Sequence, residues 1–170
     1  SEQSLKNQEE NYKRVITSTR RSRRMADAGA DVISVHLEAC ENIIETLDEI
    51  HACGRKAGIV LNPETDFSLL TREILDRVEV IQVMTVAPGI EGQEFRTDML
   101  VKINLIRNRL REMNYKIDIE VDGGVNFENV QSVVNAGASI VVSGKALFTG
   151  NLEENIQRMK QLAEDVEGNI

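Results

Sequence analysis

The segments Ala28-Gly29-Ala30-Asp31-Val32-Ile33 and Ala136-Gly137-Ala138-Ser139-Ile140-Val141 share one pattern. In each, the end of a helical segment meets a glycine, and an apolar run begins soon after it. Glycine is suited to the left-handed conformation that ends many helices. The recurrence of the same helix-to-strand junction at two distant places indicates that helices and strands alternate along this chain.

The predicted strands are short runs rich in β-branched residues. They are Val32–His36, Ala57–Leu61, Val80–Val86, Ile117–Val121 and Ser139–Val142. These runs are apolar almost throughout, as expected of parallel strands covered on both faces. Five such runs separated by helical segments predict an α/β fold with a parallel sheet. Periodicity leaves open whether the sheet is open and doubly wound or closed into a barrel, although no G-x-G-x-x-G follows the first run.

The predicted helices show apolar residues at intervals of three and four, which form one stripe on a helix. Gly54 is placed to end the first of them, and Asn126 is placed to cap another. The stripes are Ile43, Leu47 and Ile50; Met99, Ile103, Ile106, Leu110 and Met113; Phe127, Val130 and Val134; and Leu152, Ile156, Met159 and Leu162.

Composition places the chain among globular proteins, with 170 residues, 41% hydrophobic and 28% charged. The net charge of −8 disfavours binding to nucleic acid or to anionic membranes. A local basic cluster is interpreted as a solvated helix face, because no aromatic residue is interleaved with it: Arg14, Arg20, Arg21, Arg23 and Arg24. Cys40 and Cys53 lack metal-type spacing. We therefore expect reduced thiols and a cytoplasmic protein.

The chain divides into two parts by character. Residues 1–24 are polar, with a disordered stretch expected over Ser1–Asn11 and a helix possible over Tyr12–Met25. Residues 25–170 carry the whole alternating pattern and form the predicted domain.

Glycine-bearing turns follow three of the predicted strands. They begin at Val86-Ala87-Pro88-Gly89, at Asp122-Gly123-Gly124 and at Ser143-Gly144-Lys145. Glycines at the carboxyl ends of parallel strands let backbone N–H groups approach an anion, and the last loops of barrels commonly bind phosphate. Each glycine alone can equally serve a tight turn. Three such loops together, with Lys145 as a cation, favour a phosphate site.

Asp122 is the candidate for acid–base chemistry or metal binding, because it stands where an apolar strand meets a Gly-Gly turn. A helix cap or a turn residue is the simpler alternative. Met84 lies within a strand, where a thioether commonly fills the core. His36 and Glu38 are two apart and predicted to share one strand face, but two ligands do not make a metal site.

Several of these strings resemble ribulose-phosphate 3-epimerases. Val35-His36-Leu37-Glu38-Ala39 and Lys56–Pro63 are similar to the family's fourth and fifth strands, Val83–Gly89 to its sixth strand and phosphate loop, and Glu120–Val125 to its seventh. The resemblance covers about Met25–Phe148 in family order. It implies a TIM-barrel (β/α)8 fold in which strands 4 to 8 are recognisable here.

The resemblance also implies an activity of the pentose phosphate pathway. The family interconverts D-ribulose 5-phosphate and D-xylulose 5-phosphate through an enediolate that a divalent metal ion (Zn, Fe, Mn or Co) stabilises. By position, Asp122 matches a metal ligand that is also an acid/base, and Met84 matches a residue lining the reaction site. The phosphate-binding loops are matched by Gly89, Ile90, Glu91, Gly92, Gly123, Gly124, Gly144 and Lys145.

The chain also departs from the family pattern. Motifs of the first three strands, with their serine, two histidines and an aspartate, are not found before Met25, so the metal site is expected to be incomplete and the chain to pair with copies of itself or a complementing chain. Glu91 stands where the family has glycine. Alternatives are an epimerase for ketohexose 6-phosphates such as allulose 6-phosphate, and a non-catalytic phosphate-binding or assembly protein.

Overall fold

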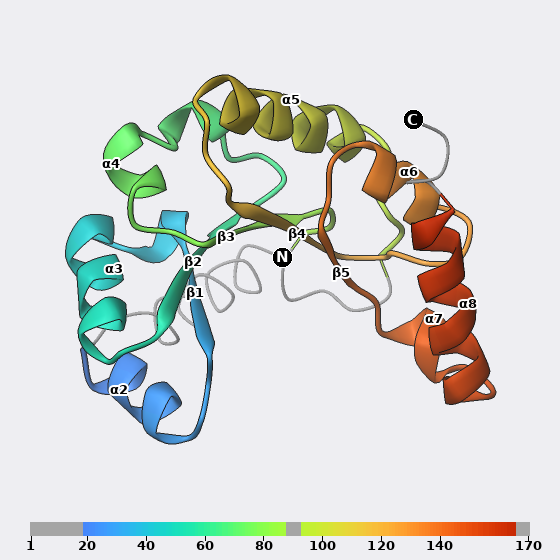
Figure 1. The fold of residues 1–170 in the computed structure, drawn as a ribbon, viewed down its shortest axis with the longest axis horizontal. Helices are drawn as coiled ribbons and strands as arrows, with labels where there is room; N and C mark the ends of the chain where they lie inside the picture. Colours follow the sequence, from blue (N-terminus) through green and yellow to red (C-terminus); the bar gives the residue numbers. More distant parts are fainter. Residues whose placement is uncertain (1–18, 88–92, 166–170) are drawn as a thin grey trace, which may run out of the picture. The chain divides into compact units, whose positions relative to one another are not determined.

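The computed structural model of the chain describes residues 19–87 and 93–165. It contains two compact units, residues 1–61 with 65–81 and residues 62–64 with 82–170. Five strands form one sheet in the order β1-β2-β3-β4-β5, which is also their order in the sequence (Figure 1). The predicted α/β class with a parallel sheet is confirmed, since the pairs β1–β2 and β4–β5 are both parallel.

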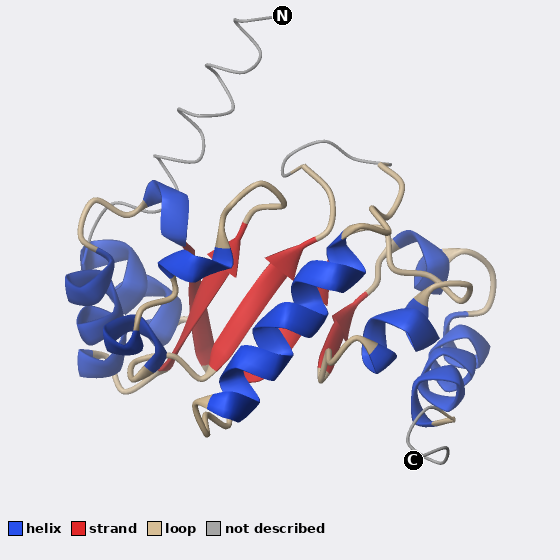
Figure 2. Ribbon diagram, turned by 90° about the horizontal axis from the view of Figure 1, so that it is seen from above, coloured by secondary structure: helices blue, strands red, loops and turns tan. Residues whose placement is uncertain are grey.

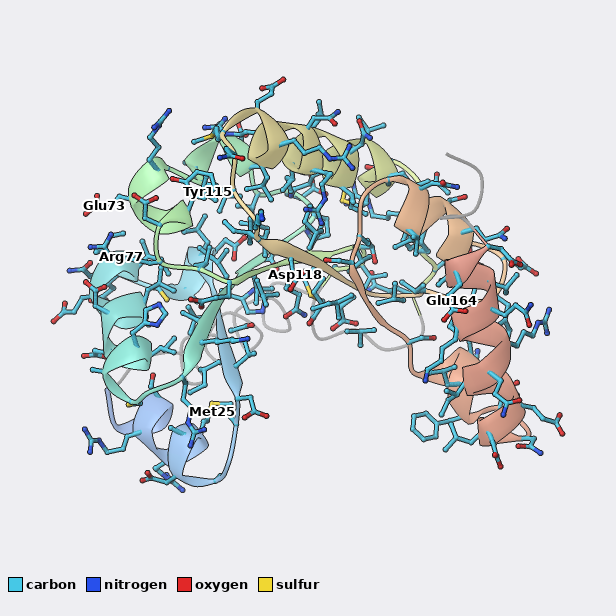
Figure 3. All side chains as sticks on the ribbon, viewed as in Figure 1. Met25, Glu73, Arg77, Tyr115, Asp118 and Glu164 are labelled. Carbon is cyan, nitrogen blue, oxygen red and sulfur yellow. The ribbon has the colours of Figure 1, made fainter. Side chains whose placement is uncertain are left out.

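The first unit alternates helices and strands as predicted. Its elements are α2 (Thr19–Asp27), β1 (Val32–His36), the 3-10 helix η1 (Leu37–Ala39), α3 (Ile43–Ala52), β2 (Lys56–Leu61), the 3-10 helix η2 (Phe67–Leu69), α4 (Arg72–Leu75) and the start of β3 (Val80–Met84). The register of β1 and β2 sets Val32 beside Lys56 and His36 beside Val60. Arg77, labelled with Glu73 in Figure 3, follows α4. Its Nε donates a hydrogen bond to Asp48 Oδ1 of α3 at 2.8 Å.

The second unit holds the end of β3 and all later elements. These are α5 (Met99–Glu112), β4 (Asp118–Asp122), α6 (Val130–Asn135), β5 (Ile140–Val142), α7 (Lys145–Phe148) and α8 (Leu152–Glu164). Figure 2 shows α5 lying across one face of the strands of this unit. None of the helices in the described parts of the chain is long and apolar enough to cross a membrane.

Burial along the strands only partly matches the prediction of strands covered on both faces. In β2, Ala57 to Leu61 are all buried. In β4, Ile119 and Val121 are fully buried, but Asp118 is exposed and Glu120 and Asp122 are half-buried. One face of β4 therefore faces the core under α5, and its other face carries acidic side chains. The predicted run Ile117–Val121 already shows this alternation, since Asp118 and Glu120 stand between its apolar residues, so the expectation of a strand covered on both faces was wrong for it.

Helices form at all four predicted stripes, but their burial differs. On α3, Leu47 and Ile50 are buried and Ile43 is half-buried. On α5, Met99, Ile103, Ile106 and Leu110 are buried as predicted. On α6, Val133 is buried with Val130 and Val134 is only half-buried. On α8 the predicted helix is present, but of its stripe only Met159 is buried, Leu162 is half-buried, and Leu152 and Ile156 are exposed.

Of the two helix-end residues predicted from the sequence, Gly54 is confirmed and Asn126 caps a different turn from the one predicted. Asn126 Oδ1 accepts hydrogen bonds from the backbone N–H groups of Glu128 and Asn129, so it caps a turn that precedes α6 rather than α6 itself. The end of α3 is as predicted, with Gly54 at φ 71° directly after the cap residue Cys53.

The segment Asn62–Glu64 packs with the second unit through side chains of that unit. Lys102 Nζ donates to the carbonyl oxygens of Asn62 at 2.8 Å and Pro63 at 3.2 Å. Arg96 forms ion pairs with Glu64 and Asp98. Two cations of the second unit thus hold the chain that leaves β2.

The two repeated junctions, around Gly29 and Gly137, are both helix ends with glycine in the left-handed conformation. Gly29 has φ 99° and Gly137 has φ 118°. Gly137 is also crowded, because an added Cβ would lie 2.7 Å from Arg107 Cβ and Cγ. Arg107 Nε donates to the Gly137 carbonyl at 2.8 Å, and its Nη1 donates to the Ile117 carbonyl at 3.2 Å. This arginine therefore connects α5 to the chain entering β4 and to the junction before β5.

Gly137→Ala is expected to lower the free energy of unfolding in urea by about 2–4 kcal/mol, because overpacking against Arg107 adds to backbone strain. Gly150→Ala is the matched control, since Gly150 also has a positive φ (89°) but nothing lies within 4 Å of its added Cβ. The control should lose only about 1–2 kcal/mol. Equal losses in the two variants would contradict this assignment of the Arg107 contact.

Candidate functional site

The ends of β3 and β4 are joined by Thr85, the residue that follows β3. Its backbone N–H donates to the Asp122 carbonyl at 2.8 Å. Its Oγ1 hydroxyl lies within hydrogen-bond distance of two carbonyls, Asp122 at 3.0 Å and Gly123. Thr85 is fully buried, so these carbonyls satisfy its polar groups where no water reaches them. The backbone of Asp122 is consequently held where the strand ends.

Two glycines follow Asp122 because the backbone there has no room for side chains. Gly123 has φ 123° and an added Cβ would lie 2.7 Å from Val86 Cγ2 and 2.8 Å from Thr85 Oγ1. Gly124 has φ 66° and its Cβ would lie 2.7 Å from the Phe95 backbone nitrogen. Both glycines are thus required by the turn and by the close approach of the chain after β3. The tight-turn alternative raised for them from the sequence is correct, and it is compatible with a ligand role for their N–H groups.

The side chains of Gln82, Met84, Glu120 and Asp122 share one face of the sheet within the second unit. All four are half-buried, whereas Val83 and Val121, which alternate with them, are fully buried. Gln82 Nε2 donates to Asp122 Oδ2 at 3.2 Å and lies 3.5 Å from Met84 Sδ. The two predicted site residues Met84 and Asp122 are therefore brought together through Gln82.

Two carboxyl groups on this face of β4 are harder to ionise than usual. Burial raises the pKa of the Asp122 carboxyl, and the hydrogen bond from Gln82 acts in the opposite direction. Burial also raises the pKa of Glu120, and the charge of Asp122 adds to that rise. A carboxyl with a raised pKa gives up and takes back protons closer to neutral pH than an exposed one, which suits an acid/base.

Asp122→Asn is expected to stabilise the fold at pH 7, because the folded pKa of Asp122 lies above its unfolded value of about 3.9. A raised folded pKa contributes stability at low pH that is lost as pH rises through it, and the neutral amide avoids this loss. The gain in unfolding free energy should be up to about 1 kcal/mol after solvent screening, and should vanish near pH 3.

Urea titrations at pH 7 and pH 3 provide the measurement. Asp118→Asn on the same strand is the control, because Asp118 is exposed and its amide can still accept the hydrogen bond from Ser139 Oγ. A pH-independent difference between the Asp122→Asn and unmodified chains would contradict the burial of charge at Asp122.

The last predicted loop, after β5, is tied to the Gly-Gly turn. Ser143 Oγ donates to the Val125 carbonyl at 2.7 Å. Gly144 and Lys145 are exposed, and an added Cβ at Gly144 would meet nothing within 4 Å. Packing therefore does not require glycine at this position. The four-residue helix α7 that follows is too short to contribute much of a dipole.

The described residues bring together Met84, Asp122, Gly123 and Gly124, with Gly144 and Lys145 on the neighbouring loop. Gly89, Ile90, Glu91 and Gly92 lie outside the described residues, as do most of the residues predicted to form a polar N-terminal segment. The prediction for His36 and Glu38 is corrected. β1 ends at His36, Glu38 lies in η1, and His36 Nδ1 is 3.5 Å from Glu38 Oε2.

Sequence reasoning missed the residues that hold Asp122 and its turn: Gln82, Thr85, Glu120 and Ser143. A signal for Gln82 was present, because it is a polar residue within the apolar run Val80–Val86. No such signal marks Thr85, since threonine is ordinary at a strand end and its partners lie 37 and 38 residues away.

The donors for a metal ion are too few among the residues that the structure describes. No group of three or more His, Cys, Asp or Glu side chains in residues 19–87 and 93–165 is placed to hold one. Asp122 offers Oδ1, which accepts no hydrogen bond from these residues, and a carboxylate oxygen suits a divalent ion. The described residues thus supply one candidate ligand rather than a complete set.

Comparison with protein families gives a match over most of the chain. The model of the family described as Ribulose-phosphate 3 epimerase matches residues 14–148. Ribulose-phosphate 3-epimerase of Escherichia coli (strain K12) is 42% identical over 123 residues, which are 72% of this chain and 54% of that protein. The enzyme of Bacillus subtilis (strain 168) is 42% identical over 124 residues, 72% of this chain and 57% of that protein. The chain spans about half the length of the curated relatives it matches.

Solved structures support the fold. The 3-hexulose-6-phosphate synthase from Salmonella typhimurium superposes with a TM-score of 0.68 at 18% identity, covering 89% of this chain and 71% of that one. KGPDC from Streptococcus mutans gives 0.66 at 14% identity, with 91% and 70% covered. The predicted TIM-barrel type, with part of the barrel recognisable, is confirmed.

Proposed function

The chain belongs to the Ribulose-phosphate 3 epimerase family, and on that premise we propose that Asp122 transfers a proton at C3 of a ketose phosphate. The substrate would be D-ribulose 5-phosphate and the product D-xylulose 5-phosphate. The observation that carries the proposal is the half-buried Asp122 carboxyl, held by Gln82 beside Met84 at a strand end that two glycines follow.

The proposed step suits the chemistry of a buried carboxylate. C3 lies next to the ketone, so its C–H bond is weakly acidic. Asp122 would take the C3 proton, the electron pair of that bond would form the C2–C3 double bond, and negative charge would develop on O2 of the enediolate. A proton would then return to C3 on the opposite face from a second acid, which is not identified among the described residues, and the C2 carbonyl would re-form. Burial raises the pKa of the Asp122 carboxyl, which makes it a stronger base for the removal step on its own face of the substrate.

The phosphate of the substrate would lie at the two glycine loops of the second unit. Backbone N–H groups near Gly123, Gly124 and Gly144 would donate to it, and Lys145 would supply a positive charge. Gly144 supports this role, because no neighbouring atom excludes a side chain at that position and the absent side chain leaves the backbone exposed. Gly89, Ile90, Glu91 and Gly92 would complete the cradle by resemblance to the family.

A divalent metal ion is part of the same proposal. The family generally uses one. Asp122 would hold it through Oδ1, the carboxylate oxygen that accepts no hydrogen bond from the described residues. When bound, the ion would stabilise the negative charge that develops on the substrate oxygen. Assembly with further copies or with a complementing chain, and a cytoplasmic location, remain predictions.

Asp122→Asn is expected to reduce proton transfer at C3 by at least about 100-fold, since an amide cannot act as the base. The measurement follows D-ribulose 5-phosphate in deuterated buffer with added divalent ion by NMR, scoring deuterium at C3 as well as D-xylulose 5-phosphate. Exchange is informative by itself, because one acid/base is sufficient for it.

Asp118→Asn should leave both rates unchanged, since Asp118 is exposed at the other end of β4. Equal exchange by the Asp122→Asn and unmodified chains would refute the proposed role. A folded chain that binds the sugar phosphate without exchange would favour the phosphate-binding alternative. Faster turnover of D-allulose 6-phosphate would favour the ketohexose alternative.

A further inference from the structure

We propose that Gln82 is a positioning residue that fixes the Asp122 carboxylate by holding one of its two oxygens. This inference rests on the proposed function of Asp122. Gln82 would not contact the reacting carbon itself. Its role would be to present the other carboxylate oxygen in one orientation.

The geometry around the Gln82 amide supports a specific hydrogen bond to the Asp122 carboxylate. Gln82 and Met84 are two apart on β3, so their side chains lie on the same face of the sheet as Asp122 on β4. The amide nitrogen is 3.2 Å from Asp122 Oδ2 and 3.5 Å from Met84 Sδ. A carboxylate oxygen and a thioether sulfur are both acceptors, so the NH2 end of the amide is the end that faces them. Each of its two hydrogens then has a partner.

The contact makes the two oxygens of Asp122 unequal. Oδ2 accepts the hydrogen bond from Gln82, and Oδ1 accepts none from the described residues. Thr85 holds the backbone of the same residue through the Asp122 carbonyl. Asp122 is therefore fixed at both its main chain and its side chain, and Oδ1 is the oxygen left for a proton or a ligand.

Such fixing matters because proton transfer depends on the placement of the base to a fraction of an ångström. A carboxylate at a strand end can rotate about two side-chain torsions, and an unheld carboxylate would spend much of its time away from C3. A simpler role for Gln82 is to fill half-buried space. Methionine has nearly the same length and volume but no N–H, and glutamate has the same shape but no donor when ionised.

The experiment compares Gln82→Met, Gln82→Glu and the control Gln131→Met in the full chain. Gln131 is an exposed glutamine on α6. Its substitution therefore measures the effect of exchanging glutamine for methionine away from Asp122. We expect kcat for C3 exchange of D-ribulose 5-phosphate to fall about 10–100-fold in both Gln82 variants, with KM changed less than about 3-fold. The Gln131→Met variant should match the unmodified chain. Exchange within about 3-fold of the unmodified chain in Gln82→Met would overturn the proposal.

A second measurement applies even where the chain turns over no sugar phosphate. Three-bond NMR couplings between the Asp122 carboxyl carbon and its backbone nitrogen and carbonyl carbon report the side-chain rotamer. We expect a single rotamer in the unmodified chain and in Gln131→Met, and averaged couplings in Gln82→Met. Unchanged couplings in Gln82→Met would overturn the positioning role.

The two proposals fail in different ways. Exchange that survives Asp122→Asn removes the acid/base role of Asp122, whatever Gln82 does. Exchange that is lost in Asp122→Asn but retained in Gln82→Met removes only the positioning role.

Discussion

The contact on which the candidate site depends is the one between Thr85 and the carbonyls of Asp122 and Gly123. A fully buried hydroxyl and a backbone N–H need acceptors, and the end of β4 provides them. To reach those acceptors, the chain after β3 must pass so close to β4 that no Cβ fits at Gly123. The two consecutive glycines after Asp122 follow from this constraint. So does the position of Asp122 as the last residue of a strand whose backbone is held on one side by its neighbour.

The ionised side chain of Asp122 lowers the stability of the fold. Its carboxyl is removed from water far enough for burial to raise its pKa, and the single hydrogen bond from Gln82 only partly opposes that effect. The half-buried Glu120 two residues earlier adds a second acidic group on the same face. An arrangement chosen for stability alone would place neutral side chains here. Acidic groups kept at a strand end are typical of sites that move protons.

Much of the fold follows from sequence patterns whose causes are local. The strand Val32–His36 was predicted with its observed bounds. Four of the five residues predicted for the α5 stripe are buried in the helix, since a helix with one buried face shows its period directly, and the fifth, Met113, is half-buried just after it. The shorter patterns were less reliable. On α6 the difference between Val133 and Val134 is one residue, and on α8 apolar spacing was present although Leu152 and Ile156 stay exposed.

The site was predictable in part for the same reason. Asp122 and the glycines were found because a charged residue at the end of an apolar run is a local signal. Their partners were not found, because Gln82 lies 40 residues from Asp122 in the sequence and meets it only across paired strands. The sequence likewise left an open sheet and a barrel equally possible until strings resembling a known family favoured the barrel, since the strands of either fold alternate with helices in the same way.

The most direct test of the account is an amide NMR titration of the chain with D-ribulose 5-phosphate. If the site is as proposed, saturating shifts gather at Gly123, Gly124, Gly144 and Lys145, with further shifts of the Gln82 side-chain amide beside Asp122. Binding that shifts other parts of the chain and leaves these signals in place would contradict the claim that the ends of β4 and β5 form the site.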